Sequence, residues 1–345
     1  MTHPIRRRLH GKRAIAATLV GAMALATAFG GAARAETDTV RLAEGFGLAY
    51  LPITVMTSEG LIEKHAAEMG LGEVTVELKR FSGGPAMIDA LLSGNVDFIS
   101  GGLPPLLRIW TRTRGKVKAM AGLVNMPLYL NTVEPDVQGL ADFDCSSKIA
   151  LPAVKVSIQA VILQMAAAKE FGMENYEKLD PCTVSMKHPD AMAALLGGQS
   201  EVKSHFASMP FLAQELKEPK VHTVTTSYEV LGGEANGAVI YLSGDWKEAN
   251  PKTYNAVWAA FQEAIELINT DKTRAAEIFV EAQGSSMSVE DVAALLEDES
   301  TIRFDATPQK IMPLVNFLAD TGRMDPAPED WTELFFENVH HLPGD

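Results

Sequence analysis

The stretch AMIDALLSG (residues 86–94), followed by VDFISGGLP (residues 96–104), decides the fold because it has a second copy further along the chain. The copy reads AMAALLGG (residues 191–198) and VKSHFASMP (residues 202–210). Each copy predicts an amphipathic helix ended by glycine, a short strand, and a loop whose proline begins the next helix. The same order also occurs in ordinary α/β proteins. Its repetition indicates two similar α/β lobes, each contributing a strand-end loop to a shared cleft.

Strands and helices alternate through the first two thirds of the chain, in the order of doubly wound α/β proteins. We predict a first set of strands at 39–43, 74–80, 96–100 and 117–123, with helices at 53–68, 84–92 and 105–113. We predict a second set of strands at 148–151, 183–186, 202–206 and 221–225, with helices at 158–171 and 190–196.

The C-terminal third is helical and has no sheet of its own. Asn250 and Pro251 predict the cap of a long helix, and Thr270, Ser288 and Thr307-Pro308 predict the starts of three more. These helices must pack on an earlier lobe, so the chain crosses between lobes twice, near 125–134 and near 232–242. Residues 36–128 and 236–345 then form lobe 1, residues 129–235 form lobe 2, and the crossings permit hinge closure.

The N-terminus resembles a secretory signal. Residues 1–13 carry five basic residues and no acid, residues 14–29 are largely apolar, and Ala33-Arg34-Ala35 provides small residues at a cleavage site. No later stretch approaches the roughly 20 apolar residues that cross a bilayer. We therefore expect residues 1–35 to be a signal peptide and the mature chain to be a periplasmic protein without membrane insertion.

Composition narrows the partners. The formal charge is −14, and the six basic residues and no acids of 1–35 leave the mature chain at −14 − 6 = −20. Such a surface repels nucleic acid and anionic membranes. The full chain is 47% apolar, and about 310 mature residues of this kind suit two domains. We expect a monomer.

Two cysteines are available for redox or metal chemistry. Cys145 and Cys182 each stand just before a predicted strand, and the helix 158–171 connects the two strands. If these strands are parallel neighbours, both thiols lie at one edge of the sheet, within reach of a disulfide in an oxidising compartment. Two unpaired, partly buried thiols are the alternative.

Several motifs, in order, resemble the nitrate/sulfonate/taurine/pyrimidine-precursor type of periplasmic solute-binding protein that serves ABC importers. They are Phe81-Ser82-Gly83-Gly84 with the helix after it, residues 95–98, Lys148 to Pro152, and Pro189-Asp190-Ala191. The resemblance spans the mature chain and implies a two-lobed type II periplasmic-binding-protein fold, a ligand between the lobes, and delivery to a membrane permease with its ATPase. Val156-Ser157 and Lys203-Ser204 depart from the family pattern, so the solute does not carry over.

Helix starts at the predicted cleft suggest an anion site. Ser82, Gly83 and Gly84 precede one helix, and Ser157 precedes another in the opposite lobe. Free backbone N–H groups at two facing helix N-termini can hold a sulfonate, nitrate or carboxylate without a buried arginine. Ordinary helix capping is the alternative for each serine.

Other residues are candidates for contact with a small anionic or heteroaromatic solute. Gly101 and Gly102 allow the backbone to approach a ligand, and Phe46 and Tyr50 can form an aromatic wall, unless they serve the turn and the core. His205, at the end of the repeated strand, can donate to a sulfonate, a carboxylate or a ring nitrogen. Asn236 lies near the second crossing and can reach the cleft or cap the hinge.

Enzymatic signatures do not appear. The sequence has no Gly-x-Ser-x-Gly elbow, His-Glu-x-x-His pair, phosphate-binding loop or dinucleotide fingerprint, so we expect no cofactor and no metal. The alternative is a periplasmic hydrolase or lyase that uses His205 as base with Ser204 or Ser208. A third class is a sensory receptor, which has the same fold and a different partner.

Overall fold

The protein contains two five-stranded sheets. The structure is a computed structural model that describes Met1 and residues 36–345. The first sheet has the order β2-β1-β3-β10-β4, with β1 (Thr39–Glu44), β2 (Thr75–Arg80), β3 (Phe98–Gly101), β4 (Val117–Asn125) and β10 (Asn236–Ser243). The second has the order β7-β6-β8-β5-β9, with β5 (Tyr129–Thr132), β6 (Lys148–Leu151), β7 (Thr183–Ser185), β8 (Val202–Ala207) and β9 (His222–Thr226). The chain passes from the first sheet to the second after β4 and returns to the first sheet at β10.

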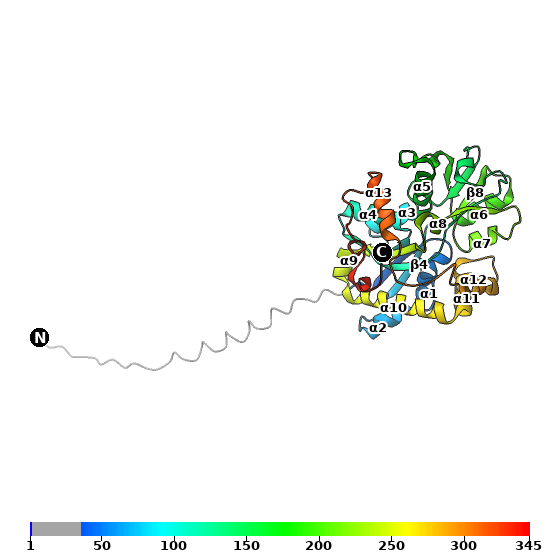
Figure 1. The fold of residues 1–345 in the computed structure, drawn as a ribbon. Helices are drawn as coiled ribbons and strands as arrows, with labels where there is room; N and C mark the ends of the chain where they lie inside the picture. The colour runs from blue at the N-terminus through cyan, green and yellow to red at the C-terminus, as the bar shows by residue number, and fades with distance from the viewer. Residues whose placement is uncertain (2–35) are drawn as a thin grey trace. The chain divides into compact units, whose positions relative to one another are not determined.

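Helices cover both sheets in an α/β arrangement (Figure 1). Elements that accompany the first sheet are α1 (Leu51–Ser58), α2 (Leu61–Glu68), α3 (Gly84–Leu92), α4 (Leu103–Thr113), α9 (Gly244–Ala249), α10 (Pro251–Thr270), α11 (Lys272–Gln283), α12 (Val289–Glu297) and α13 (Ile311–Asp320). Those of the second, green in Figure 1, are α5 (Ile158–Phe171), α6 (His188–Gly197), α7 (Phe211–Glu215) and α8 (Ser227–Leu231). The predicted mixed α/β, two-lobed fold is confirmed.

The predicted strands and helices are largely present, and the exceptions have local causes. The expected helix 53–68 is two helices, α1 and α2, because Gly60 takes a left-handed φ of 62° between them. Strands β5 and β10 were not predicted as strands. Both run antiparallel to a neighbouring β3 or β8 and fill interior positions of their sheets, next to the two crossings.

The C-terminal helices begin a little later than their sequence caps suggested. Asp271 rather than Thr270 caps α11, since its carboxylate accepts a hydrogen bond from the Arg274 N–H. Ser288 caps α12 as predicted, and α13 begins at Ile311, after Lys310 in the left-handed region. Helix α10 packs on α1 and α2 of the first sheet, as expected for helices without a sheet.

The start of α10 is capped from a distant part of the chain. The side chain of Asn250 makes no cap hydrogen bond. Instead, the Glu36 carboxylate accepts hydrogen bonds from the backbone N–H of Lys252 at 3.1 Å and of Thr253 at 2.7 Å. A carboxylate at a helix N-terminus also complements the helix dipole, so the beginning of the described chain is held to the C-terminal third.

Two short connections join the sheets side by side. The chain leaves the first sheet after Asn125 and returns to it at Asn236, and these two residues pair in adjacent strands. Nearby, the Leu128 N–H donates to the Ser227 hydroxyl at 2.9 Å. The lobe limits 36–128 plus 236–345 and 129–235, and hinge closure between them, stay predictions.

Cys145 and Cys182 form a disulfide, which confirms the expected bridge. Its geometric premise is also met, because β6 and β7 are parallel neighbours. The predicted signal peptide, residues 1–35, lies outside the described residues apart from Met1. Within the described residues, no helix has the length and apolar character that crossing a bilayer requires.

Candidate functional site

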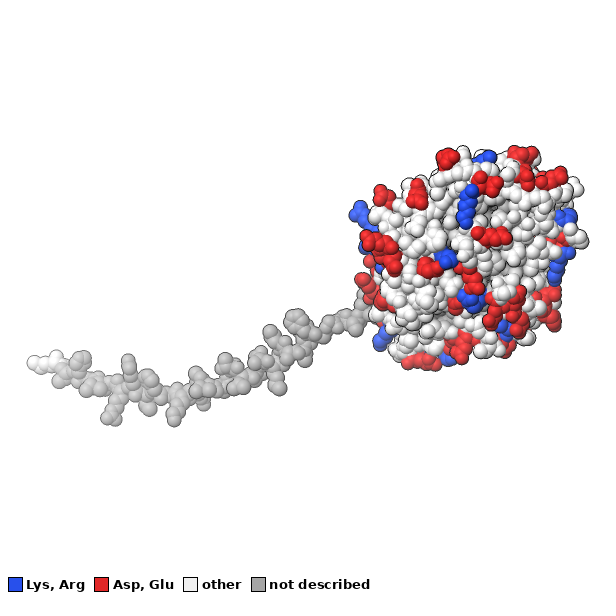
Figure 2. Space-filling view, viewed as in Figure 1, with Lys and Arg blue, Asp and Glu red and all other residues white. Residues whose placement is uncertain are grey.

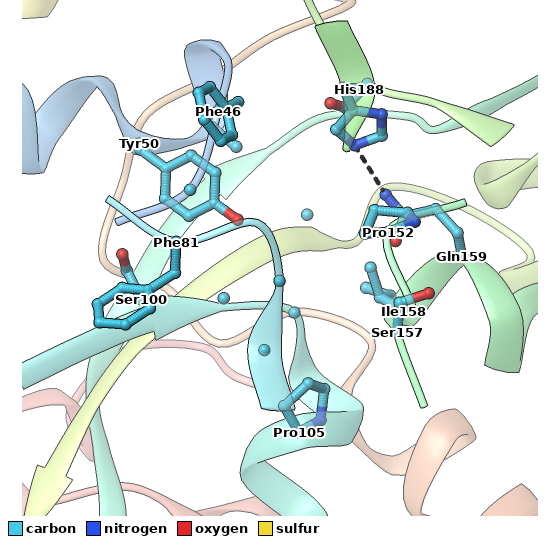
Figure 3. Close-up of a pocket in the computed structure, with 18 of the residues that line it drawn as sticks. Phe46, Tyr50, Phe81, Ser100, Pro105, Pro152, Ser157, Ile158, Gln159 and His188 are labelled. Carbon is cyan, nitrogen blue, oxygen red and sulfur yellow. Dashed lines mark hydrogen bonds between the residues drawn. The ribbon is translucent and has the colours of Figure 1, made fainter. Parts of the chain in front are cut away.

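A cavity of about 60 Å³ lies between the strand-end loops of the two sheets. Phe46, Tyr50 and Phe81 from one side face His188 and Gln159 from the other (Figure 3). Wall residues from the segments 36–128 and 236–345 are Gly45, Phe46, Ala49, Tyr50, Phe81–Gly84, Met87, Ser100–Gly102, Pro105, Met126, Leu128 and Gly237, and those from 129–235 are Pro152, Ser157–Gln159, His188 and Ser208.

Most of the sequence-predicted ligand residues come together at this cavity. Seven of them line it, and their contact with a ligand stays a prediction: Phe46, Tyr50, Ser82, Gly83, Gly101, Gly102 and Ser157. Asn236 lies outside the wall, where its side-chain amide donates to Asn125 Oδ1 at 2.6 Å and the Thr307 carbonyl at 3.1 Å. It thus links the crossing to the C-terminal loop, while its neighbour Gly237 reaches the cavity.

Three helices begin at the cavity wall. Gly83 is the N-cap of α3, Gly102 of α4 and Ser157 of α5. The Ser157 hydroxyl caps its helix by accepting from the Ala160 N–H at 3.2 Å, which leaves the first-turn N–H groups of Ile158 and Gln159 without an intrahelical partner. Ser82 is exposed and is not the cap that the sequence suggested. Converging helix N-termini favour a negatively charged ligand.

The two halves of the wall touch. A Cβ on Gly102 would lie 2.7 Å from Ile158 Cβ, and a Cβ on Gly83 would lie 3.3 Å from the Pro152 carbonyl oxygen. The Leu48 N–H also donates to the Met209 carbonyl at 3.0 Å. Glycine is needed at 102 for space rather than for backbone freedom, because its φ of −63° suits any residue.

Tyrosine hydroxyls supply neutral donors on the lobe-1 side. Burial, with a smaller contribution from the Glu44 carboxylate, raises the pKa of Tyr50 to about 12, so its phenol keeps its proton. Burial also raises the pKa of Tyr241, whose hydroxyl has no partner among the described residues. This hydroxyl lies 3.6 Å from where a Cβ on Gly101 would stand, directly behind the cavity wall.

Charged side chains stay out of the wall. Apart from His188, none of its residues is ionisable below the range of tyrosine. Two cations lie close to the ring of Phe46, with Arg80 5.7 Å and Lys187 5.6 Å from its centre, and neither residue lines the cavity. Arg80 also pairs with the buried carboxylate of Glu44, whose pKa is raised by burial and lowered in part by this arginine. A bound anion would therefore meet dipoles rather than a full positive charge.

A chain of buried polar side chains runs away from the cavity at His188. His188 Nδ1 lies 2.8 Å from His205 Nε2, and His205 Nδ1 lies 2.5 Å from Glu215 Oε1. The other Glu215 oxygen accepts from Asn131 Nδ2 at 2.9 Å. His205 and Glu215 are fully buried. The structure thus places His205 one layer behind the wall, and it places His188, which was not among the residues predicted from the sequence, in the wall.

His188 is held neutral by its surroundings. Burial, reinforced by the charge of His205, lowers the pKa of His188 well below its ordinary value. Its ring stacks on Phe211 at 5.6 Å between centroids, and its Nε2 lies 3.3 Å from the Gln159 side-chain nitrogen. A neutral imidazole offers the cavity either one N–H donor or one acceptor.

Comparison with known proteins places the chain in a family. Residues 33–281 match the family model described as NMT1-like family. The chain belongs to the NMT1-like family. No curated protein sequence matches this NMT1-like protein.

Solved structures similar to this NMT1-like protein include periplasmic binding proteins. The aliphatic sulphonate binding protein SsuA from Escherichia coli has a TM-score of 0.63 at 16% identity, covering 90% of this chain and 95% of its own. The nitrate-binding protein NrtA from Synechocystis PCC 6803 has a TM-score of 0.67 at 17% identity, covering 86% and 84%. The alkanesulfonate-binding protein SsuA from Xanthomonas axonopodis pv. citri, bound to MOPS, has a TM-score of 0.62 at 17% identity, covering 83% and 92%. At these identities the likeness establishes the shared fold.

Proposed function

We propose that this protein is the periplasmic substrate-binding component of an ABC importer, and that it captures a small oxyanion between its lobes. The permease and its ATPase then receive the solute from the closed form. Membership in the NMT1-like family and the shared fold with sulphonate- and nitrate-binding proteins support the general role. The candidate solute classes are sulfonates, nitrate, carboxylates and pyrimidines.

One observation carries the anionic class: three helix N-termini meet at a cavity whose wall contains no lysine, arginine, aspartate or glutamate. An isolated carboxylate or ammonium partner would bind a charged solute by ion pairing. Helix N–H groups, the Tyr50 hydroxyl and His188 instead provide donors without a full charge, which suits a diffuse anion such as a sulfonate or nitrate.

Cavity size favours a compact solute. A single water needs roughly 10–15 Å³ of cavity volume. The cavity of about 60 Å³ therefore has room for a small solute such as nitrate or methanesulfonate. A larger solute, such as a long-chain sulfonate, would extend beyond this volume.

The enzymatic alternative loses its central residue. A base must reach the substrate, and His205 is fully buried with both ring nitrogens engaged by His188 and Glu215. Ser204 is buried too, and its hydroxyl donates to Thr132. The similar structures from Escherichia coli and Synechocystis are binding proteins.

The acidic surface bears on delivery. Acidic side chains are spread over the face seen in Figure 2, with basic ones scattered among them. A net charge near −20 for residues 36–345 favours solubility and attracts basic surfaces, such as a basic extracytoplasmic face of a permease.

The test is a thermal-shift panel on residues 36–345 with nitrate, methanesulfonate, taurine, acetate and uracil. We expect an oxyanion to raise the melting temperature, because a ligand at about 100 times its dissociation constant stabilises the folded protein by about 2.7 kcal/mol. Tyr50→Phe removes one donor and should weaken binding about 2- to 12-fold, whereas Tyr176→Phe, the same change outside the cavity, should not. Failure of the whole panel would refute the solute classes, and chemical conversion of a ligand would indicate an enzyme.

A further inference from the structure

The chain Glu215–His205–His188 joins a buried carboxylate to the cavity without a break. Glu215 Oε1 lies 2.5 Å from His205 Nδ1, and His205 Nε2 lies 2.8 Å from His188 Nδ1. His188 Nε2 is the end of the chain at the cavity wall. When two imidazoles are hydrogen-bonded, a nitrogen that carries a proton donates and its partner nitrogen must accept. The protonation of His205 therefore determines whether His188 Nε2 is a donor or an acceptor.

With a neutral His188 and a carboxylate on Glu215, two proton arrangements satisfy every link. In the first, His205 carries two protons: Nδ1–H donates to the Glu215 carboxylate, Nε2–H donates to His188 Nδ1, and His188 then carries its proton on Nε2, facing the cavity. In the second, His205 is neutral and accepts from His188 Nδ1–H, which leaves a lone pair on His188 Nε2. The first arrangement holds one more proton and presents a donor; the second presents an acceptor.

Gln159 is suited to both arrangements. Its side-chain amide lies 3.3 Å from His188 Nε2 and can offer either its NH₂ group or its oxygen after a half-turn. An oxyanion has only acceptor atoms. It therefore competes for the Nε2–H of the first arrangement and is repelled by the lone pair of the second.

The surroundings contain few other charges. Next to His188, Lys187 at the N-cap of α6 pairs with Asp190 of that helix at 3.5 Å. The sheet neighbours of His205 are Asn131 in β5 and Ala150 in β6, and α5 contributes Gln159. Glu215 of α7 forms its ion pair with His205 alone among the described residues. Its carboxylate is thus the charge that compensates a doubly protonated His205.

We propose that His205 and Glu215 are positioning residues that place a proton on the cavity-facing nitrogen of His188, so that capture of an oxyanion takes up one proton. This inference rests on the proposed function and adds a regulation to the same site. Binding is strongest at low pH and weakens at higher pH, by up to tenfold per pH unit, where the free protein lacks the extra proton. The lowered pKa of His188 agrees with a neutral outer ring in both arrangements.

The direct test is calorimetric titration of residues 36–345 with nitrate and with methanesulfonate at pH 6, 7 and 8. Tris, imidazole and triethanolamine chloride buffers are used, because sulfonate buffers belong to the candidate ligand class. The dependence of the binding enthalpy on buffer ionisation enthalpy gives the number of protons taken up. We expect this number to rise with pH toward one, and a value of zero at all three pH values with intact binding would overturn the proposal.

Variants separate positioning from a merely structural role. Glu215→Gln keeps an acceptor for His205 Nδ1–H but removes the compensating charge, so the pH at which affinity begins to fall should move down by at least one unit. Asn131 can adapt by turning its amide, because its partner Thr223 is a hydroxyl that donates or accepts. His188→Phe keeps the stacking on Phe211 and should abolish proton uptake while weakening binding at least tenfold.

His222→Gln is the matched control. His222 lies in β9 of the same sheet and contacts the Val137 carbonyl, away from the cavity. It should leave both affinity and proton uptake unchanged. A pH profile of Glu215→Gln that coincides with that of the unchanged protein overturns the proposal, as does proton uptake that persists in His188→Phe.

A ligand-free measurement distinguishes failure of this inference from failure of the proposed function. If neither anion binds, the proposed solute class fails, and ¹⁵N spectra of the histidine rings between pH 5 and 9 decide the proton arrangement. We expect His188 to change from Nδ1–H to Nε2–H as the pH falls. Retention of Nδ1–H on His188 over the whole range overturns the switch.

Discussion

Gly102→Ala tests whether the observed contact between the wall halves is the ligand-bound geometry. The added Cβ would lie 2.7 Å from Ile158 Cβ and 2.8 Å from its Cγ2, where carbons normally stand about 3.5–4.0 Å apart. The two loops must therefore separate by about 1 Å. Overpacking of this kind costs about 1–3 kcal/mol, which corresponds to roughly 5- to 150-fold weaker binding.

The assay is calorimetric titration with the solute found by the panel, together with urea unfolding of the free protein. Opening of the lobes relieves the clash, so the free energy of unfolding without ligand should change by less than about 0.5 kcal/mol. Gly197→Ala is the control, since nothing lies within 4 Å of its added Cβ. Gly83→Ala, with the Pro152 oxygen at 3.3 Å, should have a smaller effect.

A second substitution, at Ile158, should relieve the clash that Gly102→Ala introduces. Ile158→Gly removes both carbons that the new Cβ would meet, so Gly102→Ala should weaken binding less in that background than in the unchanged protein. Equal losses in both backgrounds, or a Gly102→Ala variant that binds as tightly as the unchanged protein, would refute the closure geometry.

Three further predictions concern stability. Replacing Cys145 and Cys182 by serine should lower the free energy of unfolding by about 3–4 kcal/mol, because the bridge closes a loop with a sequence separation of 37, and reductant should then have no further effect in chemical denaturation. Glu36→Gln should cost about 1 kcal/mol in the same assay, since a charged acceptor at the start of α10 becomes neutral, and high salt should reduce the difference. Because the pKa of His188 is lowered in the folded protein, the unfolded state binds more protons below about pH 6.5. This residue should therefore lower the free energy of unfolding by about 1.4 kcal/mol between neutral pH and pH 5.5. Urea unfolding of His188→Phe should not show this loss.

Local sequence patterns predicted the elements with strong local signals. Glycine-ended helices and apolar runs located α3, α5 and the strands β3, β6 and β8, and the disulfide followed from the neighbouring strands β6 and β7. Strands β5 and β10 were not predicted because each is an antiparallel strand next to a crossing and pairs with a strand far away in the sequence. The separation is more than 70 residues between β5 and β8 and more than 100 residues between β10 and β4. Such pairing is a tertiary property that local propensity does not carry.

The sequence predicted the loops that form the cavity wall, but it selected His205, which lies behind the wall, instead of His188, which lies in it. Gly83, Gly102 and Ser157 follow from helix starts, which are local. His205 was placed at the cleft because it lies near the end of a strand, but its side chain contacts Glu215 of α7 and is fully buried. His188 stands at the start of α6, directly before Pro189, and a predicted helix start with a histidine was the signal that could have found it.

Proton coupling explains how a strongly acidic protein can hold an anion in a wall without cations. A bound monovalent anion alone would take residues 36–345 from about −20 to −21, whereas an anion with one proton leaves the charge unchanged. The proton on His205 lies roughly 8 Å from such an anion, taking the 5.0 Å between the histidine rings and about 3 Å for a hydrogen bond. At an effective dielectric constant of about 20, that separation corresponds to about 2 kcal/mol, or roughly thirtyfold in affinity. When the anion and the proton leave together, the Glu215 carboxylate still accepts hydrogen bonds from His205 and Asn131, so the same side chains are compatible with the empty and the occupied cavity.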